Sequence, residues 1–283
     1  MYNLGGRVVV ITGAGGVLCS MFAREIARHG RPKLALLDLN FKNAEAVAAK
    51  ITAAGGTAKA YGMDATKDLG VNVTKEAEVK EIATRIEKDL GKCDILINGA
   101  GGNIPGPITE DEYFVAGREK ESFFGISMDE FKAAVDLNLF GGTLIPSQIF
   151  CQQMIGRDGC SVMNVSSMCA IRPLTKVVAY SAAKASVSNF TQWLAVHLSK
   201  ANIRVNALCP GFFVTTQNKD LLLNEDGTPK DRTKKITNST PLERFGEPKE
   251  LLRAVMYLID PDNTFTTGVI LPVDGGCSAY AGV

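Results

Sequence analysis

Long hydrophobic runs are absent from the sequence of 283 residues. No stretch reaches the roughly 18 consecutive apolar residues that a membrane-spanning helix needs. The first residues, Met1–Arg7, lead almost directly into the short apolar run Val8–Ile11, without the basic segment and longer apolar segment of a secretory signal. We therefore expect a cytoplasmic protein without a membrane partner.

An excess of charge of either sign is also missing. The chain has 31 Lys and Arg residues against 30 Asp and Glu residues, which gives a net charge of +1. Nucleic-acid-binding proteins concentrate basic residues in a footprint, so this balance argues against a nucleic-acid partner. Intrinsic disorder is excluded as well, because 46% of the residues are hydrophobic and can bury a large core.

Residues that bind metals or complete nucleophilic triads are few. The two histidines, His29 and His197, lie far apart in the sequence, so we expect neither a metal site nor a Ser-His-Asp triad. The seven cysteines are an odd number without metal-type spacing, and no two are closer than nine residues, the separation of Cys160 and Cys169. Buried free thiols in a reducing compartment are the simplest interpretation.

Short apolar segments alternate with longer amphipathic segments along the chain. This alternation predicts a parallel sheet covered by helices on both faces, and right-handed crossovers make the sheet doubly wound. We therefore expect an α/β Rossmann fold in a single domain over residues 1–283. The expected strands are Val8–Ile11, Leu34–Leu37, Ile95–Ile97, Ser161–Val165, Arg204–Ala207 and Val269–Pro272, and the expected helices are Leu18–His29, Ala44–Ala54, Val79–Leu90, Met128–Leu139, Tyr180–Ser199 and Pro248–Ile259.

Two long polar segments interrupt this alternation, at about residues 101–127 and 212–245. Loops of this length inside a compact domain are usually functional. The second segment follows an expected strand at the carboxyl edge of the sheet, where ligands bind in doubly wound folds. We expect two lid-like insertions, and the alternative is a pair of solvated surface loops.

A glycine-rich turn lies between the first expected strand and helix, with the sequence Thr12-Gly13-Ala14-Gly15-Gly16-Val17-Leu18-Cys19. Backbone N–H groups in such a turn can approach a pyrophosphate at the positive end of the helix. Asp38 ends the next strand about 20 residues further on, where a carboxylate can accept hydrogen bonds from ribose hydroxyls. The turn has no Arg or Lys for a 2′-phosphate, so NAD is favoured over NADP. The alternative role of Asp38 is to cap the following helix.

A second group of residues points to proton transfer. Tyr180 and Lys184 are four positions apart and therefore share one face of a helix. Ser167 precedes Tyr180 by 13 residues, with Ser166 as the competing serine, and Asn138 lies on the preceding helix. A free tyrosine has a pKa near 10, and a lysine ammonium about 4 Å away is worth ~4 kcal/mol at an effective dielectric near 20. We expect Lys184 to lower the pKa of Tyr180 in a shielded cleft.

Together these motifs resemble the short-chain dehydrogenase/reductase family over essentially the whole chain. The resemblance implies that Tyr180 exchanges a proton with the carbonyl or alcohol oxygen and that Ser167 hydrogen-bonds the same oxygen. It further implies that Lys184 binds the nicotinamide ribose and that Asn138 holds a water that supplies protons to Lys184. Tyr180 and Lys184 thus also belong to the cofactor site.

The resemblance extends to other cofactor-binding residues. Asn98-Gly99-Ala100-Gly101 is similar to the family's Asn-Asn-Ala-Gly segment, with Gly99 in place of the second Asn. Val17 and Cys19 stand where the family turn usually has glycine. By resemblance, the expected cofactor contacts are Gly13, Gly15, Val17, Leu18, Asp38, Asp64, Ala65, Asn98, Ala100, Pro210, Gly211, Phe213 and Thr215, with Asn72-Val73-Thr74 as the alternative to Asp64-Ala65.

Several segments resemble the D-mannonate oxidoreductase (fructuronate reductase) subgroup of this family. They are Pro173–Lys176, Thr191–His197, Gly211–Asn218, Leu223–Pro229 and Ser278–Val283. The resemblance implies NADH-linked interconversion of D-fructuronate and D-mannonate. The alternatives are a gluconate- or ketogluconate-type dehydrogenase, another short-chain carbonyl reductase such as one for acyl thioesters, and a non-catalytic NAD-binding sensor.

A sugar-acid substrate needs a cation near the cleft for its carboxylate. The candidates are Lys176, Arg172 and Arg118, while Ser167, Asn103, Gln217 and Asn218 could bind the substrate's oxygens. The expected helices 128–139 and 180–199 carry broad apolar faces. In this family such helices build a homotetramer, which we expect here, with ordinary core packing as the alternative.

Overall fold

The centre of the molecule is one parallel β-sheet. The computed structural model describes residues 2–63, 69–214, 222, 228 and 230–282. Within these residues the sheet has seven strands in the order β3-β2-β1-β4-β5-β6-β7, and every neighbouring pair is parallel. The strands are β1 (Val8–Thr12), β2 (Lys33–Leu37), β3 (Thr57–Tyr61), β4 (Ile95–Asn98), β5 (Cys160–Val165), β6 (Ile203–Pro210) and β7 (Ile270–Val273).

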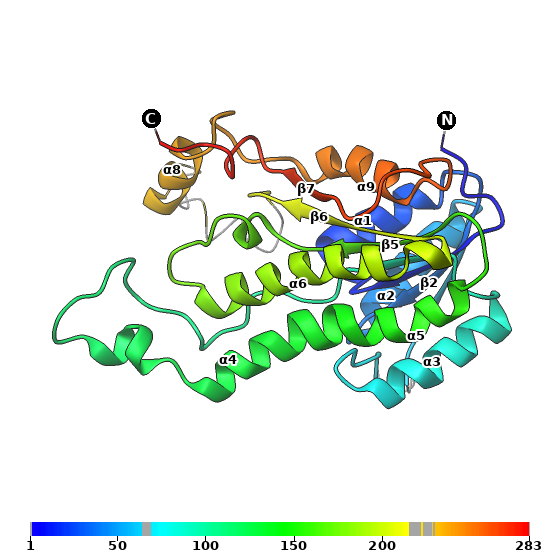
Figure 1. The fold of residues 1–283 in the computed structure, drawn as a ribbon, viewed down its shortest axis with the longest axis horizontal. Coiled ribbons are helices and arrows are strands. Elements are labelled where there is room, and N and C mark those ends of the chain that lie inside the picture. The colour runs from blue at the N-terminus through cyan, green and yellow to red at the C-terminus, as the bar shows by residue number, and fades with distance from the viewer. Residues whose placement is uncertain (1, 64–68, 215–221, 223–227, 229, 283) are drawn as a thin grey trace.

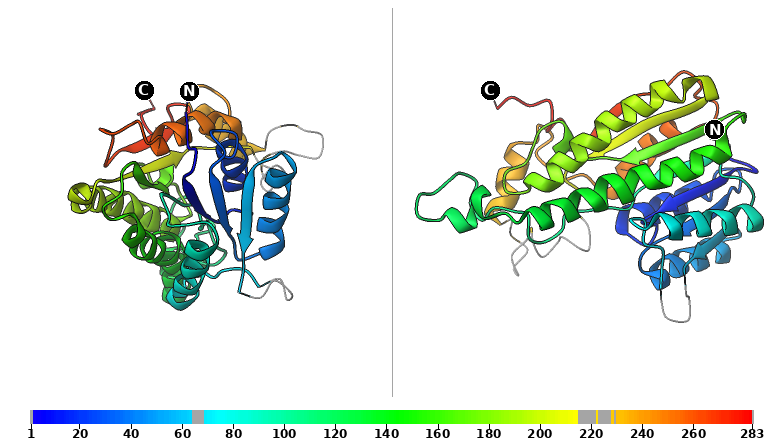
Figure 2. Two further views of the ribbon diagram at one scale, coloured as in Figure 1. Left: turned by 90° about the vertical axis from the view of Figure 1, so that its right-hand side faces the viewer. Right: turned by 60° about the horizontal axis from the view of Figure 1, so that its bottom comes forward.

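Helices cover both faces of the sheet (Figure 1; Figure 2). Successive residues of a strand point to opposite faces, so β1 contributes Val9 and Ile11 to one core cluster and Val8 and Val10 to the other. The first cluster is completed by α1 (Val17–Ile26), α2 (Phe41–Ala53), η7 (Pro248–Leu251) and α9 (Leu252–Ile259), and the second by α3 (Glu76–Asp89), α5 (Ile145–Met154) and α6 (Val178–His197). The predicted doubly wound α/β Rossmann fold is confirmed.

The helix expected at Met128–Leu139 is longer than predicted. After α4 (Met128–Val135) the chain continues through the π-helix η4 (Asp136–Leu144) into α5. Pro146 lies in the first turn of α5, so the proline does not end the helical segment. Gly142 is needed for close approach, because a Cβ there would lie 2.5 Å from the Ala100 carbonyl oxygen.

The two insertions have different structures. The first contains the 3-10 helices η2 (Glu119–Glu121) and η3 (Phe123–Gly125), and its outer part extends away from the sheet (Figure 1). The second carries α8 (Asp231–Asn238), a helix that the sequence did not predict because it contains few apolar residues. The remaining 3-10 helices are η5 (Met168–Ala170) and η6 (Ser199–Ala201).

Other expectations concern what the chain lacks. In the part of the chain that the structure describes, no helix combines the length and apolar character needed to cross a membrane. All seven cysteines are buried and unpaired, as predicted. The described residues contain no group of three His, Cys, Asp or Glu side chains arranged to hold a metal ion.

Candidate active site

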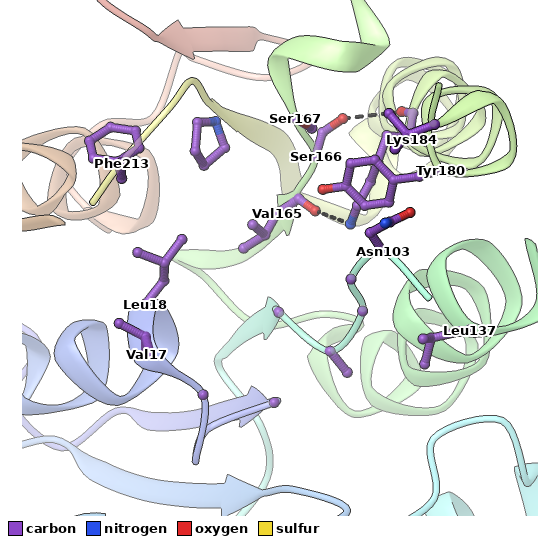
Figure 3. A pocket seen from close by; sticks show the side chains of 18 of the residues that line it. Val17, Leu18, Asn103, Leu137, Val165, Ser166, Ser167, Tyr180, Lys184 and Phe213 are labelled. Atoms are coloured by element: carbon purple, nitrogen blue, oxygen red, sulfur yellow. Dashed lines mark hydrogen bonds between the residues drawn. The ribbon is translucent and has the colours of Figure 1, made fainter. Parts of the chain in front are cut away.

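A pocket of about 870 Å³ lies at the carboxyl ends of the strands, where a doubly wound fold binds its ligands. It extends from the turn after β1 and Asp38 after β2, past residues 99–103 after β4, to Ser167 after β5 and residues 210–213 after β6. Figure 3 shows Tyr180 and Lys184 on one side of this pocket, with Leu18 and Phe213 across from them.

The glycine-rich turn is shaped by close backbone contacts. Gly13 has a φ of +66°, and a Cβ there would lie 2.9 Å from the Ala100 nitrogen, so a side chain is excluded. Gly15 does not line the pocket; its N–H donates to Asp38 Oδ2 at 2.9 Å and thereby fixes that half-buried carboxylate. No side chain caps α1, which leaves the amides of its first turn for an anionic ligand.

Two of the three departures from the family pattern, Cys19 and Gly99, compensate each other in space. Cys19 occupies a position where the family has glycine, and Gly99 one where it has asparagine. A Cβ at position 99 would lie 2.2 Å from Cys19 Sγ, so the thiol fills the space that a side chain at 99 would need. The turn is therefore not opened by Cys19, while Val17 and Leu18 line the pocket as predicted.

Two residues of the alternative segment, Asn72 and Val73, lie at the end of the pocket beside Asp38. Val71, Asn72 and Val73 line the pocket, and the Val71 N–H donates to the Asp38 backbone oxygen at 2.7 Å. Asp64 and Ala65 lie outside the described residues. So do Thr215, Gln217 and Asn218, which were expected near the nicotinamide and the substrate.

Asn98 has a structural position rather than a place on the pocket wall. Its side chain is buried, and Nδ2 donates to Ser147 Oγ at 2.9 Å and Asn164 Oδ1 at 2.8 Å. It thereby joins β4 to β5 and α5, and its side chain does not line the pocket. Ala100 and Asn103, further along the same segment, do line the pocket.

Tyr180, Ser167 and Lys184 come together as predicted. Ser167 and Tyr180 both line the pocket, where the Ser167 hydroxyl acts to lower the pKa of the Tyr180 phenol, and Lys184 Nζ lies 5.8 Å from the centre of the Tyr180 ring. The competing Ser166 is engaged elsewhere, because its hydroxyl bonds the Lys184 backbone oxygen at 3.1 Å and Ser188 Oγ at 2.8 Å. The geometry therefore favours Ser167 over Ser166.

The expected lowering of the Tyr180 pKa is wrong. Burial raises the pKa of Tyr180 to about 12, and the Ser167 hydroxyl offsets this only in part. Burial also lowers the pKa of Lys184 to about 8, and its ammonium donates to the Val165 oxygen at 2.8 Å instead of approaching the phenol (Figure 3). Desolvation of both groups thus outweighs the attraction between them.

Asn138 lies in the π-helix and is fully buried. Its Oδ1 accepts from the Gly102 N–H and its Nδ2 donates to the oxygens of Gly102 and Ala134, each at 2.9 Å. All of its side-chain hydrogen-bonding groups therefore have protein partners, and the side chain fastens the glycine segment beside Lys184. It does not line the pocket, and its expected role in holding a water stays a prediction.

Of the three cations predicted to bind a substrate carboxylate, one lines the pocket and two do not. Lys176 lines the pocket, but its Nζ donates to the Glu110 backbone oxygen at 2.6 Å. Arg172 bonds the Tyr280 backbone oxygen away from the pocket, and Arg118 forms ion pairs with two acidic residues of its own insertion. Neither arginine lines the pocket. Sequence reasoning missed Arg232 of α8, which does line the pocket.

The fold and the pocket together define an α/β oxidoreductase of the dinucleotide-binding class. A family model described as enoyl-(acyl carrier protein) reductase matches residues 18–278. The chain belongs to the short-chain dehydrogenase/reductase family and is an oxidoreductase.

Individual relatives are similar over their full length. An uncharacterized oxidoreductase of Haemophilus influenzae is 48% identical, covering 100% of this chain and 96% of the relative. UxuB, an uncharacterized oxidoreductase of Bacillus subtilis, is 46% identical over 99% of this chain and 98% of its own. A crystal structure from Haemophilus influenza, provisionally described as a D-mannonate oxidoreductase and solved with bound NAD, superposes with a TM-score of 0.92 at 48% identity and covers 100% of this chain and 98% of that one.

Proposed function

We propose that this protein is an NAD-dependent enzyme that interconverts D-fructuronate and D-mannonate. The observation that carries the proposal is the meeting of Tyr180, Ser167 and Lys184 in one pocket with the glycine-rich turn and Asp38. The similarity to the provisionally described D-mannonate oxidoreductase supports the choice of substrate.

The residues present fit NAD. Gly13 and the uncapped start of α1 offer backbone amides to a pyrophosphate, and Asp38 offers a carboxylate to the ribose hydroxyls. The described cations that line the pocket, Lys176, Lys184 and Arg232, come from α6, α8 and the segment before α6, and none belongs to the turn or the strand end beside Asp38. Asp38 would repel a 2′-phosphate, so we propose NAD in preference to NADP.

The chemistry follows from the protonation states of the site. Bound NADH supplies a hydride to the carbonyl carbon. With a pKa of about 12, Tyr180 carries its proton at neutral pH and donates it to the carbonyl oxygen as the alcohol forms. Ser167 donates a hydrogen bond to the same oxygen, where negative charge develops. Lys184, with a pKa of about 8, remains mostly charged at neutral pH and can return a proton to Tyr180.

The organisation of the protein completes the proposal. We propose one NAD-binding domain over the whole chain, with the two insertions as its lids, located in the cytoplasm. Exposed apolar side chains on the helices, among them Phe140, Trp193 and Val196, support a homotetramer. Light scattering tests this, because the proposal requires a mass four times that of the chain.

The substrate is tested by following NADH absorbance with D-fructuronate and identifying the product. We expect oxidation of NADH, slower oxidation of NADPH, and D-mannonate as the only sugar product by chromatography. Turnover of 5-keto-D-gluconate without turnover of D-fructuronate would transfer the assignment to the ketogluconate alternative. Binding of NADH without turnover of any keto sugar acid would favour the sensor alternative.

A further inference from the structure

Arg232 is the one cation lining the pocket that has neither a hydrogen bond nor an ion pair among the described residues. Lys184 donates to the Val165 oxygen and Lys176 to the Glu110 oxygen, so both ammonium groups already have partners. A guanidinium that faces a pocket with its donors free is suited to a planar, two-oxygen anion.

The structure fixes Arg232 in this position through its neighbours on α8. Ile236 lies one helical turn further along and also lines the pocket, so positions 232 and 236 share the inward face. Thr233 is buried and its hydroxyl donates to the Leu222 oxygen. Lys235 Nζ lies 2.9 Å from Glu112 Oε1, which joins α8 to the first insertion. The inward face of α8 is therefore held against the pocket from two sides.

The surrounding charges leave Arg232 available for a ligand. The first insertion brings three carboxylates to this region, Glu110, Asp111 and Glu112. Arg118 pairs with the first two, at 2.7 and 2.5 Å, and Lys235 pairs with the third. Each of these three carboxylates therefore pairs with another cation, and among the described residues none forms an ion pair with Arg232.

Lys176 has a different part in this arrangement. It adopts a left-handed conformation with a φ of +73°, which is strained for a side chain other than glycine. Its backbone oxygen accepts from the Thr109 N–H at 3.0 Å while its ammonium binds the Glu110 oxygen. Both ends of Lys176 thus hold the first insertion against the site, which makes it a positioning residue.

We propose that Arg232 binds the carboxylate of the sugar-acid substrate and gives the enzyme its preference for acids over neutral sugars. This inference rests on the proposed function, because it assigns the substrate's carboxylate at the same site. D-fructuronate and D-fructose differ only in carrying a carboxylate or a hydroxymethyl group at the end of the chain. Their comparison therefore isolates the contribution of the charged pair.

The test measures kcat and KM for D-fructuronate and D-fructose in the intact enzyme and three variants. Arg232→Gln removes the positive charge, and Arg232→Lys keeps the charge but cannot form the bidentate hydrogen bonds of a guanidinium. Lys234→Gln is the matched control. Lys234 lies on the same helix, does not line the pocket, and pairs with Asp231 at 3.6 Å. Thermal melting confirms that each variant is folded, which is expected for exposed positions.

We expect Arg232→Gln to lower kcat/KM for D-fructuronate about 10- to 100-fold, mainly through KM. The same variant leaves D-fructose turnover unchanged, Arg232→Lys recovers part of the loss, and Lys234→Gln behaves as the parent. Equal loss for both sugars, or no loss for either, would overturn the role of Arg232 while leaving the proposed function intact.

A binding measurement keeps the inference testable if D-fructuronate is not the substrate. Titration of the NAD-bound enzyme with L-tartrate, a hydroxylated dicarboxylate without a reducible carbonyl, reports anion binding without turnover. Binding that is lost in Arg232→Gln and kept in Lys234→Gln supports the anion site, even where the choice of sugar acid fails. Binding of equal strength in both variants rejects it.

Discussion

Replacing Lys184 by methionine is expected to stabilise the protein at neutral pH while removing its activity. The Lys184 side chain is only 5% exposed, and burial lowers its pKa from 10.5 to about 8. This difference corresponds to about 3 kcal/mol, the free energy that folding loses by burying the ammonium below pH 8. Methionine has a similar length and no charge, so it removes this cost.

The sign of the effect depends on pH. Below pH 8 the amine is charged in both the folded and the unfolded protein, and the full cost of burial applies. Between pH 8 and 10.5 the unfolded protein binds the proton and the folded protein does not, so the stability of the parent rises with pH. Above pH 10.5 the amine is neutral in both states, and the cost is gone.

One interaction opposes the gain. Lys184 Nζ donates to the Val165 oxygen at 2.8 Å, and methionine leaves that carbonyl without this partner, a loss of about 1–2 kcal/mol. We therefore expect Lys184→Met to raise the free energy of unfolding by about 1–2 kcal/mol at pH 7. The gain shrinks as the pH rises and becomes a small loss near pH 10.

The assay is urea unfolding followed by circular dichroism at pH 7, 8.5 and 10. The matched control is Lys200→Met, because Lys200 is exposed and its replacement should change stability little at any pH. A variant less stable than the parent at pH 7, or a stability difference that does not vary with pH, would refute the reasoning. Loss of turnover together with a gain in stability would identify Lys184 as a residue kept for function.

Three further changes test other parts of the structure. Asp38→Ala is expected to raise the KM for NADH about 10- to 100-fold while that for NADPH changes less; equal increases would contradict the assigned selectivity. Gly99→Ala should lower the free energy of unfolding by about 1–3 kcal/mol, measured by denaturant unfolding, because the added Cβ would lie 2.2 Å from Cys19 Sγ. Adding Cys19→Gly should recover part of this loss, and no recovery would show that the two sites are independent. Asp94→Asn should lower the free energy of unfolding by about 3–5 kcal/mol, because the buried carboxylate pairs with two arginines at 2.6 and 3.2 Å. The control Asp129→Asn changes an exposed carboxylate and should lower it by less than about 0.5 kcal/mol. A similar effect of both changes would contradict the importance of the buried ion pairs.

The sequence alone predicted the features that depend on local patterns of residues. Each expected strand is present, because runs of β-branched and aliphatic residues bounded by turns are typical of buried parallel strands. The helical spacing of Tyr180 and Lys184 predicted that they share one face of α6, and both line the pocket. The Rossmann topology followed from the alternation of strands and helices.

Features that depend on tertiary contacts were not predictable in this way. The direction in which the Tyr180 pKa shifts depends on how far folding removes the phenol from water, and the spacing of residues in the sequence does not show this. The π-helix at Asp136–Leu144 brings two glycines against neighbouring backbone, an arrangement without a local sequence pattern.

Arg232 was missed because the candidate cations were taken from the loop before Tyr180 and from the first insertion. Its helix carries few apolar residues and is joined by Lys235 to Glu112, which is distant in the sequence. The available signal was its location in an insertion already expected to cover the site. Examining every cation of both insertions would have included it.

The most direct test of the account compares the parent enzyme with Tyr180→Phe in the NADH-linked reduction of D-fructuronate at pH 7. The change removes one hydroxyl and keeps the ring, so NADH binding, followed by fluorescence, should be retained. The account predicts that kcat falls by about 100-fold or more, since general acid catalysis of this kind contributes roughly 10²–10⁴-fold. Turnover by Tyr180→Phe at a rate close to that of the parent would contradict the assignment of Tyr180 as the proton donor.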